Sequence, residues 1–253
     1  MKKSINKMIN ALSNILGSNI ESIYLYGSVV SNDYRKGWSD IDFICFTKSL
    51  FTDEQAEKLK MLRQTLLIKE PKNKFYRKFE GIIVPLDDFI NNKFSKLVYW
   101  GTSGQRIKQE HCVDVFSKYE IIKYGKLVYG KEVKNQLFMP SHDELKDAIK
   151  KHYFSIREHA KTTDKSLYSC GWLLDISRCI YTLKHNDVIS KTEAGKWALK
   201  NKICPVEKEL KNALKIRKRP TRYINKEKTQ QWLSSLGHSV QLYANVLQKE
   251  LEL

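Results

Sequence analysis

The chain has 253 residues, and its 45 Lys and Arg outnumber its 28 Asp and Glu, for a formal net charge of +17. That length suits one large domain or two modest ones, with a core that needs no metal or disulfide to fold. Hydrophobic residues make up 42% and aromatic residues 11%, which excludes a disordered chain. No apolar run reaches the ~18 residues of a membrane span, and the N-terminus lacks an apolar signal core. We therefore expect a cytoplasmic protein that does not enter membranes.

The cysteines argue against a disulfide framework or a zinc site. Their number is odd and no pair has CxxC spacing, so we expect reduced, mostly buried thiols. The five are Cys45, Cys112, Cys170, Cys179 and Cys204.

The positive charge suggests a polyanionic partner, which can be nucleic acid, an anionic membrane or a phosphorylated ligand such as a nucleotide. The lysines are spread over the whole chain, however, which favours a solubilising surface. The densest basic run is Lys215–Arg222. It can bind a triphosphate or nucleic acid, or it can be a solvated loop, and composition does not decide between these.

The first half of the sequence alternates predicted helices and strands. Apolar residues at helical spacing predict a helix over 5–16, and branched and aromatic residues predict strands over 22–26, 40–46 and 79–85. Pro85 ends the third strand. Further helices are expected over 53–68, from Asp87 and over 119–129.

The pattern changes at Pro140, after which only helices are expected. Ser141 and Ser190 each stand three residues before a Glu, the form of a capping box. The predicted helices cover 141–159, 166–184, 190–200, 206–216 and 226–250. We therefore expect an α/β domain over residues 1–139 and an all-helical domain over residues 140–253.

The most informative stretch joins the first two strands. The first strand leads into Gly27-Ser28, and after eleven intervening residues the second begins with Asp40-Ile41-Asp42. Because strand side chains alternate, Asp40 and Asp42 share one face, about 6–7 Å apart. Two such carboxylates repel each other unless a cation lies between them, and Mg²⁺ with substrate phosphates is the cation that such oxygens prefer.

Gly27 and Ser28 suit a phosphate beside that cation. A glycine lets a phosphate approach the backbone closely, and Ser28 can donate its hydroxyl and a helix N-terminal amide. A phosphate cradle next to a metal-binding carboxylate pair favours attack on a nucleotide phosphorus. Gly-Ser alone and Asp-x-Asp alone are each weak evidence for such a site, whereas their combination at this spacing is specific.

A third carboxylate completes the predicted site. Glu80 lies within an apolar strand, where a charge is costly unless it is paired or bound to metal. If that strand lies beside the Asp40–Asp42 strand, Glu80 can reach the metal or an acceptor hydroxyl and act as general base. The alternative is an exposed residue at a strand edge.

At these residues the chain resembles the polymerase-beta-like nucleotidyltransferase superfamily, and more narrowly the aminoglycoside adenylyltransferases that modify streptomycin and spectinomycin. The resemblance covers most of the chain. It rests on Tyr24-Leu-Tyr-Gly-Ser28, on Ser39-Asp-Ile-Asp42, on Glu80 at 38 residues after Asp42, and on the stretches 175–182 and 189–199. The resemblance implies an α+β fold, in which a polymerase-beta-like domain with a mixed sheet and helices precedes an all-α helical bundle.

The resemblance also implies roles for individual residues. By matched position, Asp40, Asp42 and Glu80 hold two Mg²⁺ ions, Glu80 deprotonates the drug hydroxyl, and Ser28 and Ser39 contact the ATP phosphates. Weaker matches assign ATP contacts to Asp114, Lys215 and Tyr243. The alternatives for these three are a surface Asp, a solvated Lys and a core Tyr.

The acceptor residues match less well. Streptomycin-competent members carry a Trp and an Asp where our alignment places Ile180 and His185, which favours spectinomycin. The spacing between Gly27-Ser28 and Asp40 is also one residue longer than in close relatives. Trp100 and Trp172 are candidates for lining the drug site, with core positions as the alternative, and a solvated helix end is the alternative for His185.

The sequence therefore predicts a monomeric enzyme that transfers AMP from ATP to a hydroxyl of an aminoglycoside or aminocyclitol, spectinomycin first and streptomycin second. Such transfer confers antibiotic resistance. One rival is the same chemistry on a lincosamide, a protein or an RNA. Another is a non-catalytic module that binds nucleotide or nucleic acid, although intact Asp40, Asp42 and Glu80 argue against it. Because these drugs are cations, the +17 charge does not serve the acceptor, and we expect a locally acidic acceptor pocket.

Overall fold

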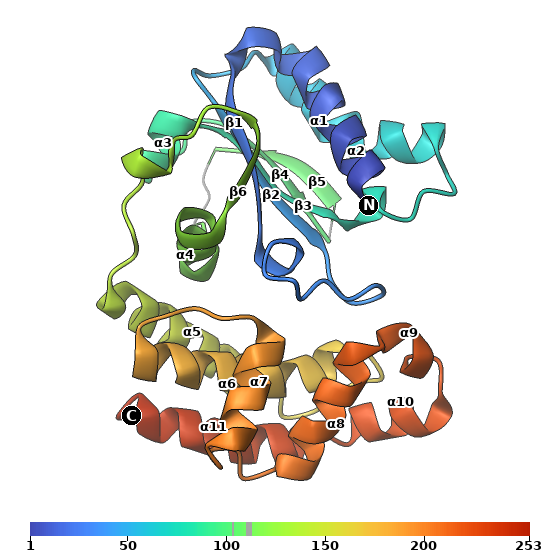
Figure 1. Ribbon diagram of the computed structural model, residues 1–253, viewed down its shortest axis with the longest axis vertical. Coiled ribbons are helices and arrows are strands. Elements are labelled where there is room, and N and C mark those ends of the chain that lie inside the picture. The colour runs from blue at the N-terminus through green and yellow to red at the C-terminus, as the bar shows by residue number, and fades with distance from the viewer. Residues whose placement is uncertain (103, 110–112) are drawn as a thin grey trace. The chain divides into compact units, whose positions relative to one another are not determined.

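The computed structural model describes residues 1–102, 104–109 and 113–253. The chain divides into two compact units (Figure 1). The first unit comprises residues 1–30 and 40–139, and the second comprises residues 31–39 and 140–253. The second unit thus includes a short segment that nothing in the sequence pattern distinguished from the N-terminal half.

The first unit is built on one mixed sheet. Among the described residues the strand order is β5-β4-β3-β2-β1-β6, in which β2 and β3 run parallel and the other neighbours run antiparallel. The strands are β1 Ile20–Tyr26, β2 Ile41–Thr47, β3 Phe79–Pro85, β4 Leu97–Gly101, β5 Gly104–Lys108 and β6 Lys126–Gly130. This confirms the expected mixed sheet of an α+β fold.

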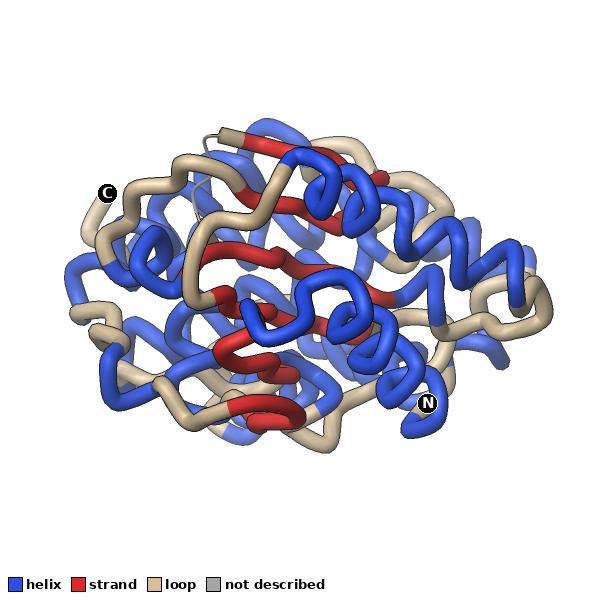
Figure 2. Tube along the Cα trace, turned by 90° about the horizontal axis from the view of Figure 1, so that it is seen from above, coloured by secondary structure: helices blue, strands red, loops and turns tan. Residues whose placement is uncertain are grey.

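Helices flank the sheet on both faces. Helices α1 (Lys2–Leu16) and α2 (Asp53–Lys69) pack together, with α1 against β1 and α2 against β4 and β5. Figure 2 shows the helix nearest the N-terminus crossing over the strands. On the opposite face, α4 (Val115–Tyr124) packs against β1, and α3 (Leu86–Ile90) follows β3 directly.

The central strands are buried on both faces, as their continuous apolar runs require. Ile44, Phe46, Ile82 and Val84 belong to a core cluster that also contains Ile121 of α4. Phe43, next along β2, points the other way and contacts Trp100 edge to face, with ring centroids 5.3 Å apart. The carboxylates of β2 and β3 therefore stand at the polar end of the face that α4 covers.

The second unit is helical apart from its short segment 31–39. Within it, α6 packs against α7, α8 and α11. Its helices are α5 His142–His159, α6 Tyr168–His185, α7 Lys191–Lys200, α8 Glu207–Lys218, α9 Pro220–Tyr223, α10 Glu227–Ser234 and α11 Gly237–Glu250. Ser141 closes the predicted capping box with Glu144. Ser190 makes only the first half of its predicted box, accepting from the backbone of Glu193, whose own side chain accepts from Lys196.

Three element predictions need correction. The predicted helix 119–129 is α4, which ends at Tyr124, followed by β6, whose backbone groups pair with β1 instead. The predicted helix 226–250 is broken into α10 and α11, because the chain passes close to Lys161 at Gly237, where a Cβ atom would lie 2.1 Å from the Lys161 carbonyl oxygen. The strands β4 and β5 were not predicted.

The cysteine expectation holds for the described part of the chain. Four cysteines there are free and buried, namely Cys45, Cys170, Cys179 and Cys204. Cys112 lies outside the described residues. A search of the described helices finds none long and apolar enough to cross a membrane.

Candidate active site

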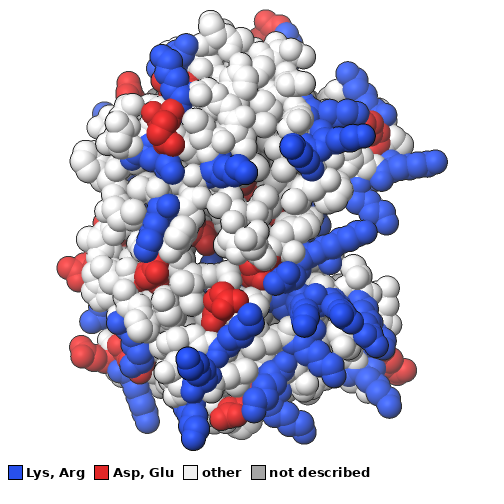
Figure 3. All heavy atoms as spheres, viewed as in Figure 1, with Lys and Arg blue, Asp and Glu red and all other residues white. Residues whose placement is uncertain are grey.

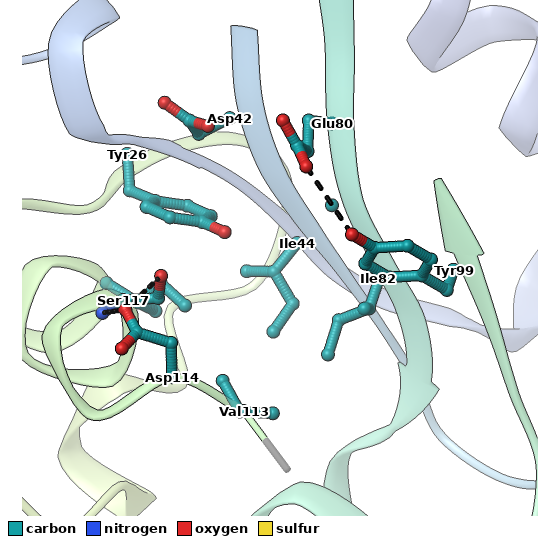
Figure 4. Close-up of a pocket in the computed structure, with 11 residues that line it drawn as sticks. Tyr26, Asp42, Ile44, Glu80, Ile82, Tyr99, Val113, Asp114 and Ser117 are labelled. Atoms are coloured by element: carbon teal, nitrogen blue, oxygen red, sulfur yellow. Dashed lines mark hydrogen bonds between the residues drawn. The ribbon is translucent and has the colours of Figure 1, made fainter. Parts of the chain in front are cut away.

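The three predicted carboxylates come from β2 and β3. The parallel register places Asp42 directly opposite Glu80, and Asp40 immediately precedes β2 with the same side-chain parity as Asp42. Figure 4 shows Asp42 and Glu80 on neighbouring strands, facing the same pocket. The condition set by the sequence, that the two strands lie side by side, is thus met.

Glu80 is held in an environment that disfavours its charge. Burial raises the pKa of Glu80 above its ordinary value, and the nearby Asp40 raises it further. A hydrogen bond donated by the Tyr99 hydroxyl (3.5 Å to Glu80 Oε1) and the positive charge of Arg63 act in the opposite direction without cancelling the shift. Burial and the neighbouring Asp40 therefore disfavour the charged form of Glu80.

Two basic side chains lie beside these carboxylates. Lys78, two residues before Glu80, places its ammonium nitrogen 3.1 Å from Asp40 Oδ1. Arg63 of α2 is buried and donates to the carbonyl oxygens of Phe79 and Gly101, each at 2.9 Å. Arg63 is thereby fixed by the ends of β3 and β4, whereas Lys78 is a flexible partner that a stronger cation can displace.

The loop after β1 brings Gly27 against Asp42. Gly27 has φ +64°, and a Cβ atom there would lie 2.4 Å from Asp42 Oδ2. Only glycine satisfies both the left-handed backbone and this close approach. The next residue, Ser28, has a buried hydroxyl without a hydrogen-bond partner among the described residues. A buried polar atom of this kind requires an external partner.

A pocket of about 240 Å³ opens on the same face. Its acidic wall is formed by Asp42, Glu80 and Asp114, and its aromatic wall by Tyr26 and Tyr99 (Figure 4). Burial raises the pKa of Tyr26 well above its usual value, and Asp42 adds to this shift, so the phenol stays protonated. The pocket is therefore acidic and aromatic, a combination that suits a cationic ligand.

A divalent cation fits the chemistry of this face. Carboxylate oxygens from Asp40, Asp42 and Glu80 form the hard donor set that Mg²⁺ prefers, and the orphaned Ser28 hydroxyl suits a phosphate beside it. As the side chains stand, the described residues contain no group of three His, Cys, Asp or Glu spaced to hold a metal. Lys78 engages Asp40 instead.

The weaker ATP candidates lie in different settings. Asp114 lines the pocket and caps α4, accepting from the Ser117 backbone at 2.9 Å. The Ser39 hydroxyl, 6% exposed with its residue, accepts from the backbone of Arg35 at 2.9 Å. Lys215 is exposed on α8, where Lys and Arg side chains gather over α8–α10 (Figure 3).

Two candidates occupy core positions. Tyr243 has no exposed surface, and its hydroxyl lies 3.1 Å from that of Ser177 inside the helical unit. Trp100 is also fully buried, and its indole nitrogen donates to the Leu59 carbonyl of α2, on the sheet face opposite Glu80. Both residues therefore occupy core positions, the alternative to a ligand contact, and neither side chain is accessible to a ligand.

The remaining acceptor candidates lie on α6. Trp172 is partly buried, with its ring 5.7 Å from that of His152. His185 is exposed at the end of α6, and its ring lies 4.4 Å from Tyr181 and 5.4 Å from Trp197. Ile180 is fully buried, so it presents nothing to a ligand. These residues belong to the second unit, whereas the carboxylates belong to the first.

Several side chains of the site escaped sequence analysis. Lys78 had a usable signal, since it stands two residues before Glu80 and so shares its face. Tyr26 had a similar signal, because it stands two residues after Tyr24 on β1 and so points to the same face of the sheet. Tyr99 and Arg63 had none, because β4 was not predicted and an arginine on a helix is usually exposed.

Two known protein families match the chain, one in each half. Residues 5–99 match the nucleotidyltransferase domain family, and residues 137–248 match the aminoglycoside adenylyltransferase C-terminal domain family. Among solved structures, the fold is similar to that of spectinomycin adenyltransferase AAD(9) from Enterococcus faecialis, crystallised with ATP and spectinomycin. The TM-score is 0.71 at 18% sequence identity, covering 98% of this chain and 99% of the other.

A search of curated proteins found no significant match. The two family matches nevertheless cover both halves of the chain in the expected order, and the polymerase-beta-like strand-Gly-Ser and Asp-x-Asp motifs meet in one site. The chain therefore belongs to the aminoglycoside adenylyltransferases, and it is a nucleotidyltransferase enzyme.

Proposed function

We propose that the acceptor is the aminocyclitol spectinomycin, and that transfer of AMP to one of its hydroxyl groups confers resistance by lowering its affinity for the ribosome. The observation that carries the proposal is the pairing of Asp42 with Glu80 in an acidic, aromatic pocket. That pocket suits a cationic, hydroxyl-rich acceptor. The similar AAD(9) structure, which contains ATP and spectinomycin, supports the same acceptor.

Glu80 is the proposed general base. Its raised pKa brings its basicity closer to neutral pH than that of an ordinary glutamate, which improves proton transfer from an acceptor hydroxyl. The hydroxyl oxygen then forms its bond to the α-phosphorus of ATP, the bond from that phosphorus to the bridging oxygen breaks, and pyrophosphate leaves. Tyr99 orients the Glu80 carboxylate through its hydroxyl.

Asp40, Asp42 and Glu80 are the proposed ligands of Mg²⁺, which when bound neutralises charge on the transferring phosphate. Ser28 is proposed to donate its buried hydroxyl to a phosphate oxygen, with Ser39, Asp114 and Lys215 as further candidate contacts to ATP. A cation bound there would compete with Lys78 for Asp40. The expected two-ion arrangement follows from the family resemblance.

Streptomycin is the less favoured acceptor. The two positions at which streptomycin-competent relatives carry a Trp and an Asp align with Ile180 and His185, and Ile180 is fully buried. His185 supplies no negative charge for a guanidino group. The proposal therefore predicts a preference among related drugs rather than a general activity.

The acceptor is tested by incubating the enzyme with ATP and Mg²⁺ and one drug from a panel of spectinomycin, streptomycin, kanamycin and lincomycin. Mass spectrometry then measures addition of AMP to each drug. We expect adduct with spectinomycin first and streptomycin second. Adduct on lincomycin alone, or ATP-dependent modification of none of the four, would contradict the proposal.

A further inference from the structure

Residues 31–39 have an unusual place in the chain. They follow the loop that carries Gly27 and Ser28, they precede Asp40 and Asp42, and yet they belong to the helical unit. The first unit contains the chain up to Val30 and again from Asp40. Any restraint on this segment is therefore transmitted through the backbone to Gly27 and Ser28 on one side and to Asp40 and Asp42 on the other.

Asp33 anchors the segment within the helical unit. Its carboxylate accepts from Arg217 of α8, with Nη2 at 2.6 Å and Nε at 3.2 Å from Oδ2. The Thr192 hydroxyl at the start of α7 donates to Oδ1 at 2.6 Å. Arg35 Nη2 lies 3.0 Å from the same oxygen. These four residues, Asp33, Arg35, Thr192 and Arg217, are called the Asp33 cluster.

The cluster is buried and its charge is compensated. The Asp33 side chain is 3% exposed and that of Arg217 is 4% exposed. Burial alone would raise the pKa of Asp33, but attraction to Arg217 and the hydrogen bonds from Thr192 and Arg217 lower the pKa below its ordinary value. The carboxylate is therefore ionised at neutral pH and held at both oxygens.

The rest of the segment is fixed by close packing. The Arg217 guanidinium lies 5.1 Å from the centre of the Trp38 ring. Gly37 has φ +88°, and a Cβ atom there would lie 2.8 Å from Thr221 Cγ2. The Ser39 hydroxyl accepts from the Arg35 backbone at 2.9 Å. Contacts thus hold the segment as far as Ser39, the residue before Asp40.

A buried ion pair is weak grounds for a gain in stability, because desolvation offsets much of the attraction. Its better attested use is to enforce one geometry among several, since the charges are satisfied in only one arrangement. Positioning within a few tenths of an ångström matters for phosphoryl-type transfer, where a displacement of about 1 Å can cost ~100-fold in rate.

We propose that Asp33 and Arg217 are positioning residues for adenylyl transfer. Because residues 31–39 belong to the helical unit, these two side chains restrain the backbone on both sides: the end of the loop that carries Ser28, and the start of the segment that carries Asp40 and Asp42. Neither residue is assigned a contact with ATP or acceptor. The inference rests on the proposed roles of Ser28, Asp40 and Asp42.

The test compares two arginines of the helical unit. Arg217→Met removes the partner of Asp33. Arg157→Met is the matched control, because the Arg157 fork of α5 also joins separate helices, donating to Gln241 at 3.0 Å and Gln248 at 2.9 Å of α11, but does not touch residues 31–39. Asp33→Asn and Arg217→Lys are milder variants that carry the same comparison if Arg217→Met does not fold.

Kinetics are measured at a temperature where circular dichroism shows each variant folded. We expect kcat to fall about 10- to 100-fold in Arg217→Met and Asp33→Asn, with the KM for the acceptor little changed. Arg217→Lys should keep part of the rate, and Arg157→Met should lower Tm with kcat within about twofold of wild type. The double variant Asp33→Asn/Arg217→Met should lose no more than the worse single variant, because both break one contact.

A second readout does not depend on turnover. Amide hydrogen exchange of residues 31–39 should accelerate in Arg217→Met and Asp33→Asn, but not in Arg157→Met, and binding of ATP should weaken only in the first two. Equal kcat and equal exchange in Arg217→Met and Arg157→Met would overturn the proposal. If wild-type enzyme modified no aminoglycoside, the proposed acceptor would fail while exchange and ATP binding still decided the positioning role.

Discussion

Two carboxylates, one in each unit, have pKa values that are shifted in opposite directions. On the β2–β3 face of the first unit, burial and the charge of Asp40 raise the pKa of Glu80. In the second unit, the attraction of Arg217 outweighs burial and lowers the pKa of Asp33. Asp175, whose side chain is 14% exposed, has a lowered pKa because Lys191, 2.8 Å from Oδ1, and Arg178 outweigh the effect of burial.

The difference distinguishes carboxylates that are suited to bind a ligand from carboxylates that stabilise the fold. A carboxylate whose charge exceeds that of its neighbours is costly until a cation arrives, and such sites cluster where function resides. A carboxylate that is fully compensated gains nothing from a ligand. Removing charge should therefore have opposite consequences for stability in the two units.

The largest expected effect is on turnover in Glu80→Gln, which removes the proposed base and one metal ligand. Transfer of AMP to spectinomycin should fall ~1,000-fold, the usual scale for loss of a general base, while ATP still binds. Steady-state transfer and equilibrium ATP binding are measured together. Near-normal turnover in this variant would refute the assignment of Glu80.

The matching change in the second unit is Asp33→Asn, which leaves Arg217 buried without its ionic partner. We expect the free energy of unfolding to fall by about 3 kcal/mol, as in other broken buried pairs. Chemical denaturation measures this beside Glu80→Gln, which should cost little or even stabilise, since it relieves repulsion from Asp40. Equal losses in the two variants would remove the contrast between the units.

A smaller effect is expected from Gly27→Ala, which directs a Cβ atom at Asp42. Turnover should drop ~30-fold, because the loop must shift by a fraction of an ångström. Gly17→Ala is the control: its φ is also positive, at +56°, but a Cβ atom there meets nothing within 4 Å. It should cost about 1 kcal/mol in stability without lowering kcat. Similar turnover in both variants would show that Asp42 is not tightly placed.

The smallest effect concerns Lys78→Met, which frees Asp40 from its resting partner. Affinity for Mn²⁺ in the presence of ATP should rise ~5-fold, since a partly exposed ion pair contributes about 1 kcal/mol. Lys96→Met, which breaks the pair with Asp53 at 2.6 Å, is the matched control. Unchanged or weaker Mn²⁺ binding in Lys78→Met would mean that Lys78 does not compete with the cation.

Much of the site could be predicted from sequence because its residues follow local rules. Asp40, Asp42 and Glu80 stand at fixed parity on strands with strong apolar patterns, and Gly27-Ser28 ends the strand before them. Their approach required only that β2 and β3 be neighbours. The capped helices of the second unit were predictable for a similar reason, since Ser141 and Ser190 act within one turn.

The rest depended on distant contacts that local patterns do not encode. Asp33 meets Arg217 across 184 residues of sequence, and Arg63 reaches the carbonyl groups of β3 and β4. The edge strand β6 overrode a helical pattern because β1 offered it backbone partners. Tyr243 was matched to an ATP contact by family resemblance and Trp100 was a candidate for the drug site, but packing places both side chains in cores.

The most direct test of the central claim is a titration with Mn²⁺ in the presence of ATP, followed by electron paramagnetic resonance, on Asp42→Asn and Asp175→Asn. Both changes remove one carboxylate charge, from the first and second unit respectively. Asp42→Asn should weaken tight Mn²⁺ binding at least ~10-fold relative to wild type, while Asp175→Asn should keep it. Wild-type affinity in Asp42→Asn, or equal loss in both variants, would contradict it.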